Sequence, residues 1–206
     1  MSDRFTACAS AIVRAGHFAA ARGWVPATSG NFSMRLDPGH LAITESGADK
    51  GTLGAHQVLV VDRAGKPLEA GRRASAETAL HWEVYEREPA VGAVVHTHSL
   101  AATVLSRAVA PEVKVVLEGY ELSKAFAGVA DHRARLELPI LENDQDTSAL
   151  ARAVRAAIEG RNSVRGYLIR GHGTYVWGKD MEEALRHLEA LESLLACALE
   201  ERKIRR

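Results

Sequence analysis

The chain has 206 residues, of which 47% are hydrophobic and 25% are charged. That composition is typical of a globular protein, and the length suffices for one sizeable core, so we expect one domain over residues 1–206. The 26 basic and 26 acidic side chains cancel, which argues against nucleic acid or an anionic membrane as the main partner. The N-terminal residues have no basic segment followed by an apolar one, and no apolar run approaches membrane-spanning length. We therefore expect a cytoplasmic protein.

Hydrophobic spacing, capping residues and turn residues predict helices that alternate with strands. The expected helices cover residues 2–23, 75–87, 100–108, 146–159 and 180–202, and the expected strands cover 32–36, 40–44, 58–62, 93–98, 113–117, 166–170 and 174–177. Residues 118–124 are expected to form a loop or a short helix. This order, with its early hairpin, is typical of an α/β fold in which helices cover a mixed sheet. Cys8 and Cys197 fall in expected helices far apart in the chain, so we expect two buried free thiols.

Two histidines end the apolar segment Ala93-Val94-Val95-His96-Thr97-His98. Residues i and i+2 of a strand point to the same face, so His96 and His98 would present their rings side by side. A third histidine, His172, follows another apolar segment and lies between two glycines, which allow close approach of the backbone. Three imidazole ligands with one open position are typical of a catalytic zinc site. A solvent-facing pair or a hydrogen-bonded core histidine is the alternative for the His-x-His motif alone.

Three short polar segments offer hydroxyls and accessible backbone amides: Ser29-Gly30-Asn31, Ser46-Gly47 and Ser75-Ala76. Ser75 is also expected to cap a helix, and a helix N-terminus holds a phosphate without much net charge. Lys50 is a candidate for the countercharge. Each segment taken singly fits a turn or a cap better, so the prediction depends on the fold bringing them together. The six other histidines have no partner at ligand spacing, and surface or packing roles are expected for His17, His40, His56, His81, His132 and His187.

Five motifs resemble, in their order, the class II aldolase and adducin family of zinc-dependent enzymes that act on sugar phosphates. They are Thr28-Ser29-Gly30-Asn31-Phe32-Ser33, Ile43-Thr44-Glu45-Ser46-Gly47, Ser75-Ala76-Glu77, His96-Thr97-His98-Ser99 and Gly171-His172-Gly173, and they span nearly the whole chain. The resemblance implies a class II aldolase-like, three-layer α-β-α sandwich with a mixed, largely antiparallel sheet. It implies a zinc ion in each subunit, held by His96, His98 and His172, although the same nitrogens also suit iron, cobalt or nickel. It implies that a substrate phosphate is held by Gly30, Asn31, Ser46, Gly47 and Ser75. It further implies a ring-shaped homotetramer with zinc sites near the subunit boundaries.

Residues 117–124, 139–143 and 170–178 are most similar to the branch of this family that dehydrates 5-methylthioribulose 1-phosphate to 5-methylthio-2,3-dioxopentyl phosphate in methionine salvage. Aldolases of the family commonly have Asn-His-Gly where this chain has Gly171-His172-Gly173. Fuculose- or ribulose-phosphate aldolase activity is the alternative, and a non-catalytic adducin-like association module is a third interpretation. Retention of all three histidines argues against the module, because a scaffold has no need for an open metal site.

Two glutamates are candidate catalytic groups. In the dehydratase branch the metal acidifies the C3 hydrogen of the ketose phosphate, and an acid/base group removes it and protonates the departing C4 hydroxyl. The resemblance gives that role to Glu121. Glu77 matches the catalytic glutamate of the aldolases, so it is expected beside the zinc, as a ligand in the empty enzyme or as a second acid/base group. Judged without the resemblance, Glu121 fits a solvated loop carboxylate and Glu77 fits a first-turn residue favoured by the helix dipole.

Overall fold

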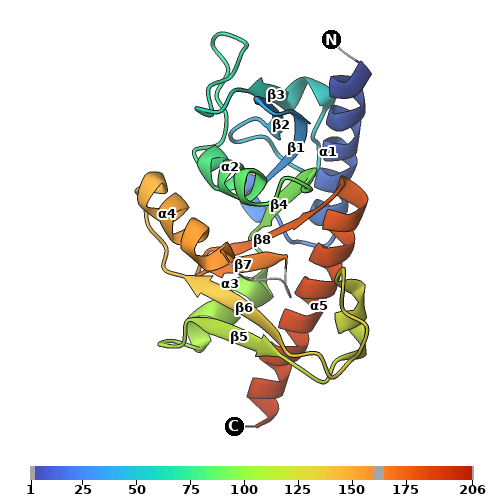
Figure 1. Cartoon of the computed structure of the whole chain (residues 1–206), viewed down its shortest axis with the longest axis vertical. Helices are drawn as coiled ribbons and strands as arrows, with labels where there is room; N and C mark the ends of the chain where they lie inside the picture. Colours follow the sequence, from blue (N-terminus) through green and yellow to red (C-terminus); the bar gives the residue numbers. More distant parts are fainter. Residues whose placement is uncertain (1–2, 160–164, 206) are drawn as a thin grey trace.

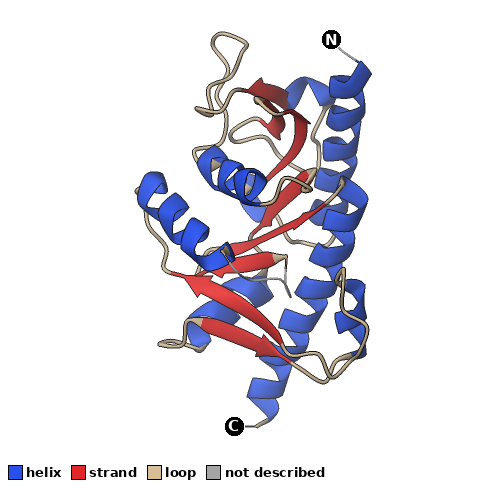
Figure 2. Ribbon diagram, viewed as in Figure 1, coloured by secondary structure: helices blue, strands red, loops and turns tan. Residues whose placement is uncertain are grey.

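The computed structural model describes residues 3–159 and 165–205. Within these residues the strands form one eight-stranded sheet in the order β3-β2-β1-β4-β8-β7-β6-β5. Neighbouring strands are antiparallel except β6 and β7, which are parallel. Helices cover both faces of the sheet (Figure 1, Figure 2). The predicted three-layer α-β-α arrangement with a mixed, largely antiparallel sheet is therefore confirmed.

The elements agree with the predicted ranges to within a few residues, apart from two differences described below. The strands are β1 (Asn31–Asp37), β2 (His40–Thr44), β3 (Val58–Val61), β4 (Ala93–Thr97), β5 (Lys114–Leu117), β6 (Leu136–Leu141), β7 (Gly166–Ile169) and β8 (Gly173–Gly178). The α-helices are α1 (Asp3–Ala21), α2 (Thr78–Arg87), α3 (Leu100–Ala108), α4 (Thr147–Ile158) and α5 (Met181–Ile204). Three short 3-10 helices are η1 (Pro26–Thr28), η2 (Ala55–Gln57) and η3 (Glu121–Ala125).

The first difference is β6, a strand that the sequence pattern does not predict. Pro139 has no amide hydrogen, and proline is usually excluded from the interior of a sheet. Here the amide of Ile140 donates to the carbonyl oxygen of Val113 at 2.7 Å, and Ile140 pairs in parallel with Leu168 of β7. Pairing with neighbours on both sides thus stabilises a strand that local preference disfavours.

The second difference is the start of α2. The prediction that Ser75 caps this helix is wrong, because α2 begins at Thr78 and Glu77 occupies the N-cap position without a side-chain cap. The Ser75 hydroxyl instead accepts hydrogen bonds from the Glu77 amide at 3.2 Å and from the Asn31 side chain at 3.1 Å. Residues 75–78 form a turn in which the Thr78 amide donates to the Ser75 carbonyl oxygen at 3.1 Å.

Two hydrophobic clusters fill the spaces on the two sides of the sheet. Helices α1, α3 and α5 cover one face, and α2 and α4 cover the other (Figure 1). Alternation along β4 divides its residues between the clusters, with Ala93 and Val95 in the first and Val94 in the second. The same alternation turns His96 toward the α2 side and Thr97 toward α5.

The two cysteines are free thiols, as predicted, but they differ in exposure. Cys8 is buried and Cys197 is exposed. The expectation of burial is wrong for Cys197 because it lies outside the apolar stripe of α5, which includes Leu191, Leu194 and Leu195. No helix in residues 3–159 or 165–205 is long and apolar enough to cross a membrane.

Candidate metal centre and adjoining pocket

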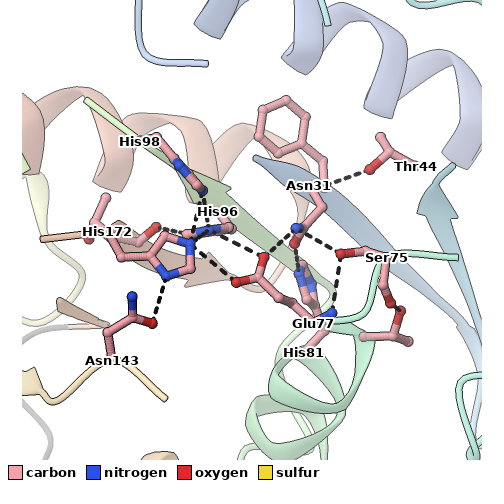
Figure 3. Close-up of polar contacts among 12 residues, drawn as sticks. Asn31, Thr44, Ser75, Glu77, His81, His96, His98, Asn143 and His172 are labelled. Atoms are coloured by element: carbon pink, nitrogen blue, oxygen red, sulfur yellow. Dashed lines mark hydrogen bonds and ion pairs between the residues drawn. The ribbon is translucent and has the colours of Figure 1, made fainter. Parts of the chain in front are cut away.

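Three imidazole rings and one carboxylate converge where β4 ends (Figure 3). His96 lies in β4, His98 directly follows it, and His172 lies in the turn between β7 and β8. The Nε2 atoms of His96 and His98 are 2.8 Å apart, those of His98 and His172 are 3.1 Å apart, and those of His96 and His172 are 3.3 Å apart. With Glu77 they form the one group of three or more ligand-type side chains, among the described residues, whose donor atoms all lie within 4.8 Å of one another.

These separations suit a tetrahedral metal site. Zinc–nitrogen bonds of about 2.0–2.1 Å at tetrahedral angles place the ligand nitrogens roughly 3.3 Å apart. Nδ1 of His96 is 2.9 Å from the carbonyl oxygen of Thr174. Because a carbonyl oxygen only accepts, Nδ1 carries the hydrogen, and Nε2 presents its lone pair to the other two rings. The residues present therefore fit a zinc ion or a chemically similar divalent metal.

Burial keeps two of these histidines neutral. Burial lowers the pKa of His96 well below its usual value, and the neighbouring His98 and His172 lower it further. Burial, with the charges of His172 and Lys50, lowers the pKa of His98 to about 4. Neutral imidazole is the form that binds a metal. At neutral pH, His96 and His98 are therefore ready to act as ligands.

The turn that carries His172 is packed closely against its surroundings. Gly171 has a φ of 67°, and its amide donates to the Ser106 hydroxyl of α3 at 3.0 Å. A Cβ atom on Gly173 would lie only 1.9 Å from the carbonyl oxygen of Thr97. The backbones of β4 and β8 thus approach more closely at this point than a residue with a side chain permits.

Glu77 lies between the histidines and α2. Its Oε1 is 3.2 Å from Nε2 of His172, and its Oε2 is 3.4 Å from Nε2 of His96. The side-chain amide of Asn31 donates to Oε2 at 2.8 Å. At these distances Glu77 is placed to complete a four-ligand group or to exchange a proton with a substrate at the site.

A pocket of about 350 Å³ opens beside the histidines. Its walls come from the polar segments in which the sequence predicts phosphate binding, together with Glu77 and two of the histidines. The lining residues are Ala27, Thr28, Ser29, Gly30, Asn31, Glu45, Ser46, Gly47, Ser75, Ala76, Glu77, His98 and His172. The fold therefore brings five of the six residues predicted to hold a phosphate to one pocket, from three separate segments.

The loop before β1 has an unusual backbone conformation. Ala27 and Thr28 have φ angles of 51° and 64°, in the left-handed region that residues with side chains rarely adopt. Gly30 has a φ of 75°, and a Cβ atom there would lie 2.6 Å from the carbonyl oxygen of His96. The Ser29 hydroxyl is buried and has no hydrogen-bond partner within the described part of the chain. Strain and an unpartnered polar group are both typical of a ligand-binding loop.

Lys50, the sixth predicted phosphate residue, is not among the residues that line the pocket. Its side chain is buried, and its Nζ donates to the carbonyl oxygens of Thr28 at 2.7 Å and of Ala48 at 2.6 Å. Burial lowers the pKa of Lys50 to about 8. The ammonium group thus connects two of the three segments that form the pocket, the loop before β1 and the loop after β2.

Glu121 lies outside this pocket in the single chain. It is the first residue of η3, its side chain is 73% exposed, and it pairs with Lys124. Nδ1 of His132 is 3.9 Å from its other carboxylate oxygen. The structure therefore brings together the predicted metal ligands, most of the predicted phosphate residues and Glu77, but it does not bring Glu121 to them.

His81 is a buried polar residue beside the site, for which the sequence pattern indicates only a surface or packing role. It is fully buried, and its ring contacts the side chain of Asn31. The sequence does contain one indication of a role for His81, which is its spacing from two other polar residues. Glu77, His81 and Tyr85 are spaced four residues apart, which places all three on one face of a helix.

Glu192 of α5 is a second such group, on the opposite face of the sheet. It is 3% exposed, and it accepts a hydrogen bond from the Thr97 hydroxyl at 3.0 Å. Burial raises the pKa of Glu192 to about 7, although hydrogen bonds from Ser99 and Thr97 lower it in part. Because Thr97 lies between His96 and His98, its hydrogen bond to Glu192 fixes the end of β4 from the opposite face of the sheet.

Comparison with known proteins agrees with this description. Residues 10–199 match the family described as "Class II Aldolase and Adducin N-terminal domain". A methylthioribulose-1-phosphate dehydratase of Marinobacter nauticus is 50% identical over 203 residues, which cover 98% of each chain. Another, of Granulibacter bethesdensis, is 55% identical over 198 residues, covering 94% of this chain and 92% of that protein. The crystal structure of L-fuculose-1-phosphate aldolase from Thermus thermophilus matches with a TM-score of 0.76 and 29% identity, covering 95% of each chain. Sequence and fold agree, and the chain is a member of the class II aldolase and adducin family.

Proposed function

We propose that this protein is a zinc-dependent hydro-lyase of methionine salvage, which removes water from 5-methylthioribulose 1-phosphate and forms 5-methylthio-2,3-dioxopentyl phosphate. The observation that carries the proposal is the cluster of His96, His98 and His172 beside a polar pocket. It occurs in a chain about half identical, over nearly its full length, to two proteins named methylthioribulose-1-phosphate dehydratase.

The phosphate end of the substrate binds, in this proposal, in the pocket beside the histidines. None of the described residues that line it is lysine or arginine. Binding therefore depends on hydroxyls and backbone amides, including the unpartnered Ser29 hydroxyl, with the ammonium of Lys50 behind them. Neutral donors on a compact loop suit a phosphate ester of a small sugar.

A bound metal would supply a Lewis acid that polarises the substrate carbonyl and stabilises negative charge beside it. The protein's own groups supply the remaining steps. The loops fix the phosphate, and Glu121 removes the proton from C3 and then protonates the C4 hydroxyl, which leaves as water. Glu77 lies beside the histidines and serves as a ligand in the absence of substrate or as a second acid/base group.

Because Glu121 lies outside the pocket of its own chain, we infer that it acts in the pocket of a neighbouring subunit of a homotetramer. Such a contact would join the region near the histidines of one chain to η3 of another, and a large apolar side chain is exposed in each of these two regions. Leu100, two residues after His98, is 76% exposed, and Leu122, next to Glu121, is 45% exposed. A subunit contact that covers both would bring η3 of one chain toward the pocket of another. We propose a cytoplasmic enzyme without a nucleic-acid or membrane partner.

Product analysis tests the proposed reaction. Zinc-loaded protein incubated with 5-methylthioribulose 1-phosphate is expected to form the diketone phosphate. The position of Glu77 favours one second candidate, an aldolase, in which a base at the C4 hydroxyl leads to cleavage of the C3–C4 bond. Formation of dihydroxyacetone phosphate without any diketone phosphate would replace the hydro-lyase by the aldolase.

A hybrid oligomer tests the role and position of Glu121. Glu121→Gln and His98→Ala are each expected to be inactive when expressed alone, and Glu121→Gln is expected to keep its metal. If Glu121 serves a neighbour, co-expression of the two variants with random mixing restores about a quarter of the sites, because some pockets then combine intact ligands with an intact carboxylate. Absence of any restored activity in verified hybrids would place the acid/base group within one chain.

A further inference from the structure

A buried hydrogen-bond network connects Glu77 to the core between α2 and β1, and Figure 3 shows its outer part, Glu77, Asn31 and His81. It consists of Glu77, His81 and Tyr85, which are four residues apart, and of Asn31 and Ser33, which are two residues apart on β1. The helical spacing turns the first three toward one side of α2, and the strand spacing turns the other two toward one face of the sheet. We call these five residues the α2–β1 network.

The direction of each hydrogen bond can be followed from the carboxylate. The Asn31 Nδ2 donates to Oε2 of Glu77 at 2.8 Å and to the Ser75 hydroxyl at 3.1 Å. Both amide hydrogens of Asn31 are then used, and its Oδ1 faces Nε2 of His81 at 2.5 Å. An amide oxygen only accepts, so the ring of His81 must carry its hydrogen on Nε2.

The second ring nitrogen completes the network. With the hydrogen on Nε2, Nδ1 of His81 has only a lone pair, and the Ser33 hydroxyl donates to it at 2.7 Å. The Ser33 oxygen in turn accepts from the Tyr85 hydroxyl at 2.9 Å. Ser33 and His81 are fully buried, and Tyr85 is 1% exposed. Burial lowers the pKa of His81 to about 3, so the ring stays neutral and both of its nitrogens have a fixed partner.

We propose that His81 is a positioning residue for Glu77. As a fixed Nε2–H tautomer it holds the Asn31 amide with its nitrogen toward Glu77, and this holds the carboxylate toward His96 and His172. Without that donor, the Asn31 side chain is free to reverse and set its oxygen against the carboxylate, which repels Glu77 from the histidines. The inference rests on the proposed function only for its effect on turnover, and its effect on metal binding is independent of substrate.

Three variants separate positioning from general stability. His81→Phe keeps an aromatic ring but removes the Nε2 donor, and it should lower kcat by about 100-fold with little change in KM. His81→Gln should recover most of that loss, because its amide nitrogen can occupy the place of Nε2. His187→Phe is the matched control. His187 is equally buried, with Nδ1 2.8 Å from the Trp177 carbonyl oxygen, on α5 away from the pocket. His187→Phe should lose thermal stability while keeping kcat near that of the unchanged protein.

Metal affinity gives a second readout that needs no substrate. Chelator competition with zinc should show roughly tenfold weaker binding in His81→Phe than in His187→Phe. The substitution frees Asn31, the hydrogen-bond partner of Glu77, and disturbing such a partner of a ligand typically weakens metal binding by at least that factor. Equal kcat and equal zinc affinity in the two phenylalanine variants would overturn the proposal. If the unchanged protein does not dehydrate 5-methylthioribulose 1-phosphate, the proposed function fails, and the zinc comparison still decides the role of His81.

The tautomer itself can be observed in the unchanged protein, which covers the case in which His81→Phe does not fold. Nitrogen-15 labelling of histidine should show His81 as an Nε2–H tautomer that does not titrate between about pH 5 and 8. A hydrogen on Nδ1, or protonation within that range, would contradict the direction of the network and overturn the proposal.

Discussion

Substitution of Gly173 by alanine tests how closely the strand after His172 must approach β4. A Cβ atom on Gly173 would lie 1.9 Å from the carbonyl oxygen of Thr97 and 2.9 Å from its carbonyl carbon. Real Cβ atoms essentially never come within 3.0 Å of such atoms, so the two backbones must separate by roughly 1 Å. Because Thr97 lies between His96 and His98, this displacement moves His172 relative to the other two histidines.

The expected loss of stability has two sources. Overpacking of a well-packed core costs about 1–3 kcal/mol, and a buried backbone group that loses its partner costs about 1–3 kcal/mol. Thr97 pairs with Thr174 at the end of the ladder between β4 and β8, so at least one buried hydrogen bond is weakened. We expect Gly173→Ala to reduce the free energy of unfolding by about 3–4 kcal/mol, which lowers Tm by roughly 10 °C for a chain of this size.

Thermal unfolding and zinc competition measure the two effects. The matched control is Gly39→Ala, in the turn between β1 and β2, where the nearest atom to an added Cβ is Asp37 Oδ1 at 3.5 Å. The control should change the free energy of unfolding by no more than about 0.5 kcal/mol, and it should keep its zinc affinity. If Gly173→Ala unfolds within about 2 °C of the control and binds zinc equally well, the close approach of the two strands is refuted.

The shifted pKa values of Glu192 and His81 predict how the free energy of unfolding depends on pH, and a third prediction concerns zinc binding by a His98 variant. The pKa of Glu192 is raised from 4.5 to about 7, so its contribution to stability is full below pH 4.5 and is lost as pH rises through 7. Relative to the unchanged protein, Glu192→Gln should therefore have a free energy of unfolding about 3 kcal/mol higher at pH 8 and nearly equal at pH 4.5, as measured by denaturant unfolding. The pKa of His81 is lowered from 6.5 to about 3, so the unfolded state takes up a proton first as pH falls below 6.5. The protein should lose about 2–3 kcal/mol from this group between pH 7 and 4.5, a loss absent from His81→Gln in the same titration. His98→Ala should retain its circular dichroism spectrum but bind no zinc by elemental analysis.

Local pattern sufficed to predict most elements and the clustering of the three histidines. The two-residue spacing of His96 and His98, after an apolar strand, determines that both rings emerge where β4 ends. Gly171 and Gly173 around His172 indicate a close turn, and the structure has one there. What local pattern does not contain is pairing between distant segments. β6 forms despite Pro139 because β5 and β7 lie on either side of it.

The surroundings of the candidate catalytic and phosphate-binding residues were less predictable, because they depend on burial and on contacts with distant segments. Lys50 has the charge expected of a phosphate ligand, yet its ammonium is buried against the carbonyl oxygens of Thr28 and Ala48. His81 has no partner at ligand spacing in the sequence, and its proposed positioning role rests on contacts with residues of β1. Glu121 does not line the pocket of its own chain, and its proposed place in a neighbouring subunit's pocket depends on a subunit contact that local sequence pattern does not contain.

The two glutamates differ in freedom as well as in position, and this difference bears on the choice between losing water and breaking a carbon–carbon bond. Glu77 accepts a hydrogen bond from Asn31 and lies 3.2 Å from His172 Nε2, so its carboxylate is confined to the immediate surroundings of the histidines. Dehydration requires one group to take a proton from C3 and to deliver a proton to the oxygen on C4, so that group must reach two neighbouring positions. The exposed Glu121 on a short 3-10 helix has the freedom that this requires, whereas Glu77 does not. In the proposed reaction, a held carboxylate beside the histidines and a freer one from a neighbouring subunit would divide the work, and the placement of the proton would select between dehydration and carbon–carbon cleavage.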